Sequence, residues 1–262
     1  MQLRRRDFLS LVGWALAGCT ANSPTSRAAT SGTRPSTSET LHARRQTPEE
    51  EVTSTRPATT TTTAPPVRVI EVIERAGWGA AVAAPGMIEH TVERLTIHHT
   101  GTVLEDNRLA PSRLRDHQAS HQTDRGWPDL AYHFAVDREG NIYEGRSVEF
   151  RGDTATRYDP TGHLLVVLEG NFDVEGTADP QLRSLTELLA WAAGRYSVGV
   201  ETIKSHRDYL PGETACPGEN LYALLESGEL VGAVRSLTDE LIELIYLRGE
   251  EAVARIVEIE AP

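Results

Sequence analysis

Cysteine, aromatic residues and net positive charge are all scarce in this chain. Two cysteines among 262 residues are too few for a disulfide scaffold, so each needs its own explanation. A formal net charge of −12 argues against non-specific nucleic-acid binding, which depends on neutralising phosphates with Lys and Arg. The 21 glycines follow no triplet period, which excludes a collagen-like fibre. The length is typical of one domain or two small ones.

Residues 1–19 combine a basic start with a short apolar stretch. Three consecutive arginines from Arg4 precede an apolar segment shorter than the roughly 20 residues that a transmembrane helix needs, which is typical of a signal peptide. The arginines resemble a twin-arginine export signal, and the Leu-Ala-Gly-Cys sequence ending at Cys19 resembles a bacterial lipobox. An ordinary cleaved signal with a chance cysteine is the alternative. We expect export to the cell envelope and lipid anchoring at Cys19 to the outer face of the membrane.

Residues 20–66 have the composition of a disordered linker. Of these 47 residues, 20 are Ser or Thr, 6 are Pro and none is aromatic, so the segment has little apolar surface to offset its chain entropy. A folded domain is expected over residues 67–226. Residues 227–262 are predicted to be an acidic helical extension, because their leucines and isoleucines fit an amphipathic helix that packs on the domain or mediates association.

Apolar patterns after residue 66 predict strands that alternate with helices. The residues 67–73 alternate as in an edge strand. Further strands are predicted at 95–98, 130–136, 141–144 and 164–168, and helices at 111–123 and 180–196. This order predicts an α/β fold, in which helices cover a β-sheet.

Three residues that are distant in sequence have the chemistry of a zinc site. His98 ends a predicted strand, His206 begins a loop rich in Gly and Pro, and Cys216 lies ten residues later on the same loop. Two imidazoles and a thiolate suit Zn²⁺, and three protein ligands leave a fourth position open, as in catalytic zinc sites. By spacing alone, a set of residues that binds no metal remains the alternative.

Two other metal sites fit the sequence less well. His117 and His121 stand at i and i+4, but no glutamate lies between them as a metalloprotease helix requires, so we interpret them as one face of a groove. A blue-copper site needs a further His or Met after the cysteine, and none follows Cys216.

Several segments, in order, resemble one family. They are RAGWGA around Trp78, IHHT from Ile97, HQTDRGWPDLAYHFAVDREGNIYEGR from His121, and SHRDYLPGETACPGENLY from Ser205. Together they resemble the zinc-dependent N-acetylmuramoyl-L-alanine amidases of the superfamily that contains peptidoglycan recognition proteins and the phage-lysozyme amidase. The resemblance covers roughly residues 68–226 and implies a mixed central β-sheet flanked by helices.

The resemblance also implies an activity and roles for individual residues. The activity is hydrolysis of the amide between N-acetylmuramic acid and the L-alanine of the stem peptide, with peptidoglycan as the partner. The zinc ligands would be His98, His206 and Cys216. The other implied positions are the catalytic Tyr132, Thr214 at the oxyanion, and His121, Trp127 and Arg146 at the substrate.

The chain departs from the family pattern at two places near the predicted site. Residues 151–154 replace a Gly-Ala-His segment that lines the substrate groove in relatives. Val167 stands where cytoplasmic relatives carry a catalytic glutamate. Glu169 lies two residues further on the same strand face, where it is either a substitute base or a carboxylate in a salt bridge or in solvent.

Three functions therefore compete. They are a zinc amidase, a non-catalytic peptidoglycan-binding lipoprotein of the same fold, and a structural lipoprotein with a vestigial fold. The presence of all three candidate ligands favours the enzyme. The sequence does not predict an oligomeric state.

Overall fold

A seven-stranded mixed sheet organises residues 67–262, the part of the chain that this computed structural model describes. Its strand order is β6-β2-β5-β3-β4-β1-β7, and β3 and β4 are antiparallel while every other pairing is parallel. The strands are β1 (Arg68–Ile73), β2 (Arg94–His99), β3 (Phe134–Val136), β4 (Ile142–Glu144), β5 (His163–Leu168), β6 (Lys204–Ser205) and β7 (Ile242–Leu247). The predicted signal, Cys19 and linker lie outside the described residues.

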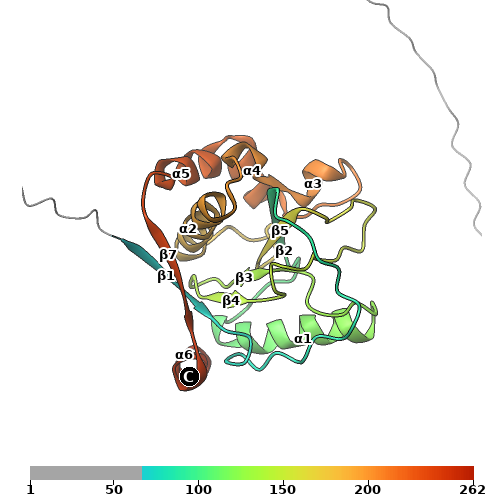
Figure 1. Cartoon of the computed structure of the whole chain (residues 1–262), viewed down its shortest axis with the longest axis vertical. Coiled ribbons are helices and arrows are strands. Elements are labelled where there is room, and N and C mark those ends of the chain that lie inside the picture. The colour runs from blue at the N-terminus through green and yellow to red at the C-terminus, as the bar shows by residue number, and fades with distance from the viewer. Residues whose placement is uncertain (1–66) are drawn as a thin grey trace, which may run out of the picture. The chain divides into compact units, whose positions relative to one another are not determined.

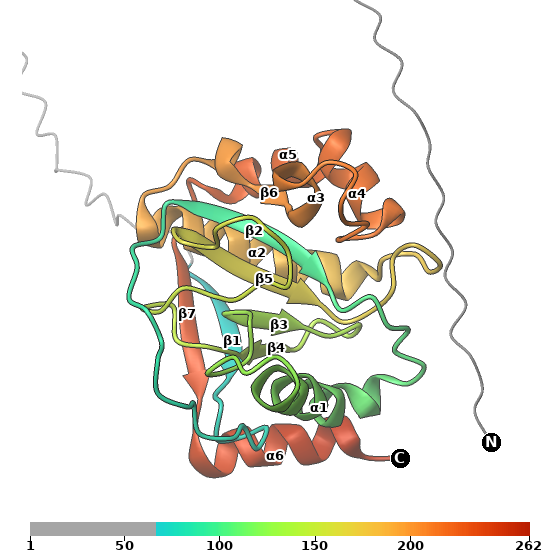
Figure 2. The same cartoon turned by 90° about the vertical axis from the view of Figure 1, so that its right-hand side faces the viewer.

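Helices cover both faces of this sheet (Figures 1 and 2). One face carries α2 (Asp179–Tyr196), α4 (Glu219–Glu226) and α5 (Glu229–Leu237), and the other carries α1 (Ala110–Thr123) and α6 (Gly249–Glu260). Each layer of helices seals its own apolar cluster against the sheet. The short helix α3 (His206–Tyr209) and the 3₁₀ turns at Asn107–Leu109 and Val200–Thr202 complete the elements. The predicted α/β fold, with its mixed central sheet flanked by helices, is confirmed.

The interior strand β5 shows why the sequence forms this architecture. Its residues read His-Leu-Leu-Val-Val-Leu and all six are buried, as a continuous apolar run requires when helices cover both faces. It pairs in parallel with β2, with His98 beside Val167, and with β3 on its other side. The sheet thus brings the end of β2 into the middle of the fold.

The predicted strand over 130–136 is shorter in the structure and begins at Phe134. The preceding residues nevertheless stay bonded to the neighbouring chain, because Gly145 donates to the carbonyl of His133 at 2.8 Å and Arg146 to that of Tyr132 at 2.8 Å. A Cβ at Gly145 would lie 2.2 Å from the Tyr132 carbonyl oxygen. Only glycine permits this close approach, which fixes the backbone of Tyr132.

The prediction of a wholly helical C-terminal extension is wrong in its middle. Residues 242–247 form β7, which pairs in parallel along β1, so β1 is not the edge strand that its alternation predicted. Ile242, Leu244 and Tyr246 alternate toward the α2 side, where they pack on the apolar cluster. In the sequence, the leucines and isoleucines of this segment also fit helical spacing. In the fold, however, the otherwise unpaired edge of β1 offers backbone hydrogen bonds that only a strand can make with it.

The remainder of the extension is helical and packs on the sheet. The side chains of Ala252, Ile256 and Ile259 on α6 are buried with Trp78 on the α1 side. A Cβ at Gly77 would lie 2.4 Å from that of Ala252, so the loop before Trp78 accepts α6 only with glycine there. Residues 227–262 therefore complete the folded unit. None of the helices in residues 67–262 combines the length and apolar character needed to cross a membrane.

Candidate metal centre and active site

Strand pairing places two of the candidate ligands next to each other. β2 and β6 are parallel with Ile97 beside Ser205, so the next residues along each chain, His98 and His206, are also neighbours. His206 begins α3, whose start is held by a capping box in which the Asp208 carboxylate accepts from the backbone N–H and the hydroxyl of Ser205. The imidazole ring centroids of the two histidines lie 4.9 Å apart.

The third ligand reaches the same place because its loop folds back on α3. The N–H of Arg207 donates to the carbonyl of Cys216 at 2.9 Å, and the N–H of His99 donates to Cys216 Sγ at 3.4 Å. The predicted alternation of the histidine pair agrees with these contacts. The His99 ring stacks on Phe172 in the cluster on the α2 side, whereas the His98 ring lies beside Tyr132 on the α1 side.

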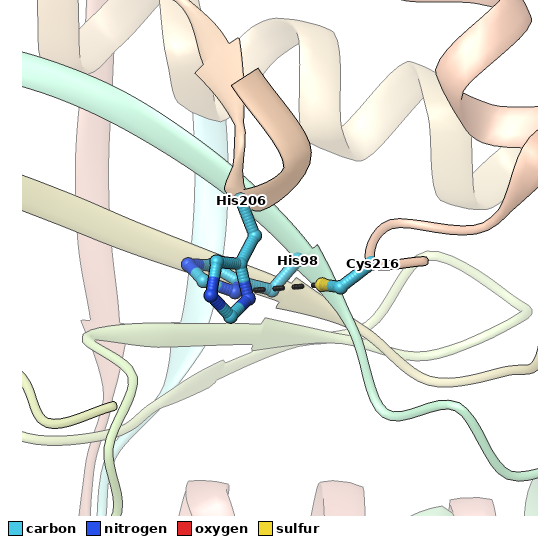
Figure 3. A group of neighbouring side chains, drawn as sticks. All are labelled: His98, His206 and Cys216. Carbon is cyan, nitrogen blue, oxygen red and sulfur yellow. Dashed lines mark hydrogen bonds between the residues drawn. The ribbon is translucent and has the colours of Figure 1, made fainter. Parts of the chain in front are cut away.

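The three ligand atoms have a spacing that fits one metal ion. They lie within 4.8 Å of one another, and His98 Nδ1 is 3.6 Å from Cys216 Sγ (Figure 3). In a tetrahedral zinc site with Zn–N of about 2.1 Å and Zn–S of about 2.3 Å, a nitrogen and a sulfur ligand are roughly 3.5–3.6 Å apart. The donor set and this separation therefore suit a zinc-like ion held by three protein ligands.

Burial sets the protonation of these groups in the direction that metal binding needs. Burial, and secondarily the charge of His206, lowers the pKa of His98 well below its usual value, and burial lowers the pKa of His206 to about 4. Both imidazoles are neutral at pH 7 and offer a lone pair. Burial raises the pKa of the Cys216 thiol to about 12, so the thiolate forms only beside a positive charge, which a divalent ion provides.

Two hydrogen-bond donors predicted for the reaction lie next to this cluster. The Tyr132 ring is centred 5.2 Å from that of His98, and burial, with the nearby Cys216 and Glu169, raises the pKa of its phenol. Tyr132 therefore stays protonated and can donate. The Thr214 hydroxyl oxygen accepts from the Cys216 N–H at 3.1 Å, which leaves the hydroxyl hydrogen free to donate elsewhere.

Two of the residues predicted to contact substrate, His121 and Trp127, form an aromatic group with Tyr132. His121 on α1 lies between Trp127 and Tyr132, with ring centroids 4.8 and 5.9 Å away. Its Nδ1 accepts from the Ala131 N–H at 3.1 Å, and burial lowers its pKa to about 4, so at pH 7 the neutral ring carries its hydrogen on Nε2. Both side chains are only partly buried.

The structure contradicts the substrate contact predicted for Arg146. Its side chain is 1% exposed, and its guanidinium donates to the carbonyls of Leu130, Arg151 and Asp129 and to the Asp153 carboxylate. These bonds hold the loop after β4 against the segment before β3. Arg146 is a structural residue here, because a charged group is buried only where such partners satisfy it.

Glu169 has an environment that the sequence did not reveal. It is 1% exposed, and neither carboxylate oxygen has a hydrogen-bond partner among residues 67–262. The Nε2 atom of His117 on α1 lies 3.7 Å from the Glu169 carboxylate and is itself buried without a hydrogen bond among the described residues. This burial excludes a solvated carboxylate and places Glu169 beside His117, and its role as a substitute base stays a prediction.

Sequence reasoning missed two residues that touch the ligands. Thr156 Oγ1 lies 2.7 Å from His206 Nε2, and Tyr158 Oη lies 3.4 Å from His98 Nε2. Both belong to the loop between β4 and β5, directly after the residues at which the chain departs from the family pattern. That departure was the only signal, because no ligand or catalytic motif contains either residue.

The comparison with protein families agrees with this site. The family described as N-acetylmuramoyl-L-alanine amidase matches residues 89–219, half of the chain, and the match contains all three candidate ligands. The chain belongs to this family. Among the elements of the described structure, β1, β7 and α6 lie outside the residues that match the family.

Individual relatives carry two kinds of name. Peptidoglycan recognition protein 1 of Mus musculus is 29% identical over 162 residues, which cover 60% of this chain and 87% of the mouse protein. The N-acetylmuramoyl-L-alanine amidase of Sus scrofa is 29% identical over 160 residues, which cover 58% of this chain and 26% of the pig protein. The relatives of this chain therefore include proteins named for peptidoglycan recognition and proteins named as amidases.

A solved structure shares the fold. Peptidoglycan recognition protein-LE, in complex with tracheal cytotoxin, a monomeric diaminopimelic acid-type peptidoglycan, is 28% identical and superposes with a TM-score of 0.54. The superposition covers 60% of this chain and 92% of that chain. The family match and this neighbour together confirm the predicted family resemblance.

Proposed function

We propose that this chain is a zinc-dependent hydrolase that cleaves the amide bond between N-acetylmuramic acid and the L-alanine of the peptidoglycan stem peptide, for remodelling or turnover of the cell wall. The observation that carries the proposal is the convergence of His98, His206 and Cys216 in a set of three ligands that suits an open zinc site. Amidase-named relatives and a neighbour solved with a peptidoglycan fragment support the substrate class.

The proposed chemistry assigns separate tasks to the zinc and to the side chains. His98, His206 and Cys216 would hold the zinc, which would supply Lewis acidity and a nucleophile at neutral pH. Tyr132, protonated because its pKa is raised, donates a hydrogen bond to the carbonyl oxygen of the substrate as negative charge develops there. Thr214 donates a second such bond through its free hydroxyl hydrogen.

The substrate in this proposal lies along the α1 side of the cluster. His121 donates from Nε2 to a polar group of the glycopeptide, and Trp127 provides an apolar surface beside it. Glu169 is the candidate for a substitute base in this proposal. Its buried carboxylate oxygens have no hydrogen-bond partner among residues 67–262, and one of them lies 3.7 Å from His117 Nε2.

The proposal extends to where the protein acts. Residues 1–19 are proposed to direct export to the bacterial cell envelope, and Cys19 to carry the lipid that anchors the chain to the outer face of the membrane. Residues 20–66 would then connect the anchor to the catalytic unit. The formal net charge of −12 agrees with a partner other than nucleic acid.

The second candidate is a non-catalytic peptidoglycan-binding lipoprotein of the same fold. Recognition proteins among the relatives support it. The complete ligand set favours the enzyme, because a receptor needs no open metal position.

Metal analysis and mass spectrometry of digested wall distinguish the two candidates. The enzyme should contain about one zinc per molecule and release free stem peptides from purified peptidoglycan, leaving muramic acid without peptide. A protein that holds zinc and sediments with peptidoglycan but releases no peptide would establish the binding module instead.

A further inference from the structure

One loop contacts both candidate histidine ligands through their Nε2 atoms. The segment 154–158 lies in the loop between β4 and β5, where Thr156 contacts His206 at the start of α3 and Tyr158 contacts His98 near the end of β2. A third contact ties it to the loop that carries Cys216, because the Arg157 guanidinium pairs with the Glu213 carboxylate. The same five residues therefore touch every chain segment that provides a ligand.

The contacts identify which ring nitrogen of each histidine faces the metal position. His98 Nδ1 lies 3.6 Å from Cys216 Sγ, so its Nε2 is the nitrogen directed at Tyr158. His206 Nε2 is 2.7 Å from the Thr156 hydroxyl oxygen, which leaves Nδ1 for the metal. A metal-bound histidine carries its hydrogen on the other nitrogen and donates it to an acceptor.

The acceptors are themselves held in place. The Thr156 hydroxyl can accept from His206 and donate to Thr154 Oγ1, which lies 2.7 Å away and also accepts from the Thr156 N–H at 3.1 Å. The Tyr158 ring stacks on Tyr209, the last residue of α3, at 5.6 Å and 18°. Its ring centroid is also 5.0 Å from that of His206.

We propose that Thr156 and Tyr158 are positioning residues that fix the tautomer and ring orientation of His206 and His98, so that the loop 154–158 sets the affinity of the metal centre. The inference rests on the proposed function, because it requires a metal at this site. It assigns a role to two residues that belong to no ligand motif. Of the two residues, Thr156 should have the larger effect on metal affinity. Its contact is the shorter one, and within residues 67–262 it is the only hydrogen-bond partner of His206 Nε2.

The test measures zinc binding directly. The zinc dissociation constant of the full 262-residue chain is determined by competition with a chromophoric chelator, and the visible spectrum of the Co²⁺-substituted protein reports ligand geometry. Thr156→Val keeps the side-chain shape and removes the acceptor, so it should raise the dissociation constant about 10- to 100-fold and alter the Co²⁺ spectrum. Tyr158→Phe keeps the stacked ring and should show a smaller rise.

Two control variants separate positioning from general damage to the loop. Thr156→Ser restores the hydroxyl and should bind zinc nearly as the unaltered protein does. Thr161→Val removes an exposed hydroxyl, bonded to Asp159, from the same loop, and should leave zinc affinity unchanged. Circular dichroism of the metal-free variants establishes whether each is folded. If Thr156→Val does not fold, the zinc affinity of Tyr158→Phe decides the outcome.

The outcomes distinguish this inference from the proposed function. An unaltered protein that binds zinc and cleaves peptidoglycan, with Thr156→Val and Tyr158→Phe binding zinc equally well, would overturn the positioning role alone. An unaltered protein that binds no zinc would overturn both. A Thr156→Ser protein as weak as Thr156→Val would also count against the hydroxyl as the acceptor.

Discussion

The residues around His98 divide into groups that face the metal position and groups that hold them there. His98, His206 and Cys216 present their donor atoms within 4.8 Å of one another, while Tyr132 and Thr214 stand beside them as donors to substrate. The Arg146 guanidinium, in contrast, donates its hydrogen bonds to carbonyl groups of the protein and is not available to a substrate. At this scale, function depends on which polar atoms remain unpaired after folding.

Replacing Cys216 by serine should abolish metal binding and turnover together. Two histidines alone hold an open-site zinc poorly, and a serine hydroxyl ionises far less readily than a thiol at a metal. Zinc content by atomic spectroscopy should fall from about one per molecule to a small fraction, and chelator treatment of the unaltered protein should cause the same loss of activity. Turnover equal to that of the unaltered chain would refute the ligand assignment.

Replacing Tyr132 by phenylalanine should slow the reaction without removing zinc. The phenol stays protonated because its pKa is raised, and losing one donor to a developing oxyanion reduces kcat by about 10²- to 10³-fold. Steady-state kinetics on a soluble muropeptide, with metal analysis of the same sample, measure the effect. Tyr246→Phe on β7, a tyrosine away from the ligands, is the matched control and should retain activity.

At the scale of secondary-structure elements, parallel pairing and one short helix assemble the site. The register of β2 and β6 sets the two histidines side by side, and the return of the loop after α3 brings Cys216 to them. The C-terminal elements act at a distance from this chemistry. β7 covers the edge of β1, and α6 seals the apolar cluster beneath Trp78.

Truncating one buried side chain of α6 should destabilise the unit. Ile256 is 6% exposed, so Ile256→Ala removes buried methyl groups and leaves a cavity, at a cost of about 2–5 kcal/mol in the free energy of unfolding. Its neighbour Val257 is 62% exposed, and Val257→Ala should change that free energy by less than about 0.5 kcal/mol. Denaturant titrations compare the two variants, and equal stabilities would contradict the packing of α6.

At the scale of the whole folded unit, buried histidines link stability to pH. Burial lowers the pKa of His133 to about 3 and that of His163 to about 4, in addition to His121 and His206. Unfolding returns each pKa to about 6.5. Between these values the unfolded chain binds more protons than the folded one, so stability rises with pH in this window and is lost on acidification.

His133 provides the sharpest test of this dependence, because both its ring nitrogens have backbone partners. Its Nδ1 accepts from the Leu165 N–H at 2.8 Å and its Nε2 contacts the Phe150 carbonyl at 2.9 Å. The free energy of unfolding of the metal-free protein should fall between pH 6.5 and 4.5. His133→Asn should reduce that slope by up to about 1.4 kcal/mol per pH unit. Parallel slopes for the two proteins would contradict a neutral, buried His133.

The proposed membrane anchor is also a property of the whole chain. Cys19→Ser removes the residue that would be lipidated, so the protein should move from the membrane fraction to the soluble fraction of the envelope. Immunoblots of fractionated cells measure this, with zinc content and wall hydrolysis as controls that should not change. Membrane association that survives the substitution would rule out lipidation at Cys19.

The sequence by itself determined the fold class, five of the strands in their succession along the chain, and the three ligand candidates. These follow from local patterns and from chemistry, since continuous apolar runs require two covered faces and zinc accepts few ligand types. Even the opposite directions of His98 and His99 were predictable, because neighbouring side chains of a strand alternate.

Tertiary structure decided whatever depends on contacts between distant segments. The leucines after residue 237 fit either a helix or a strand until the free edge of β1 selects the strand. The charge of Arg146 suits a substrate equally well until carbonyls of three other residues surround it. Thr156 and Tyr158 contact the Nε2 atoms of His206 and His98 only in the folded chain. No local sequence pattern predicts the path of the loop that brings them there.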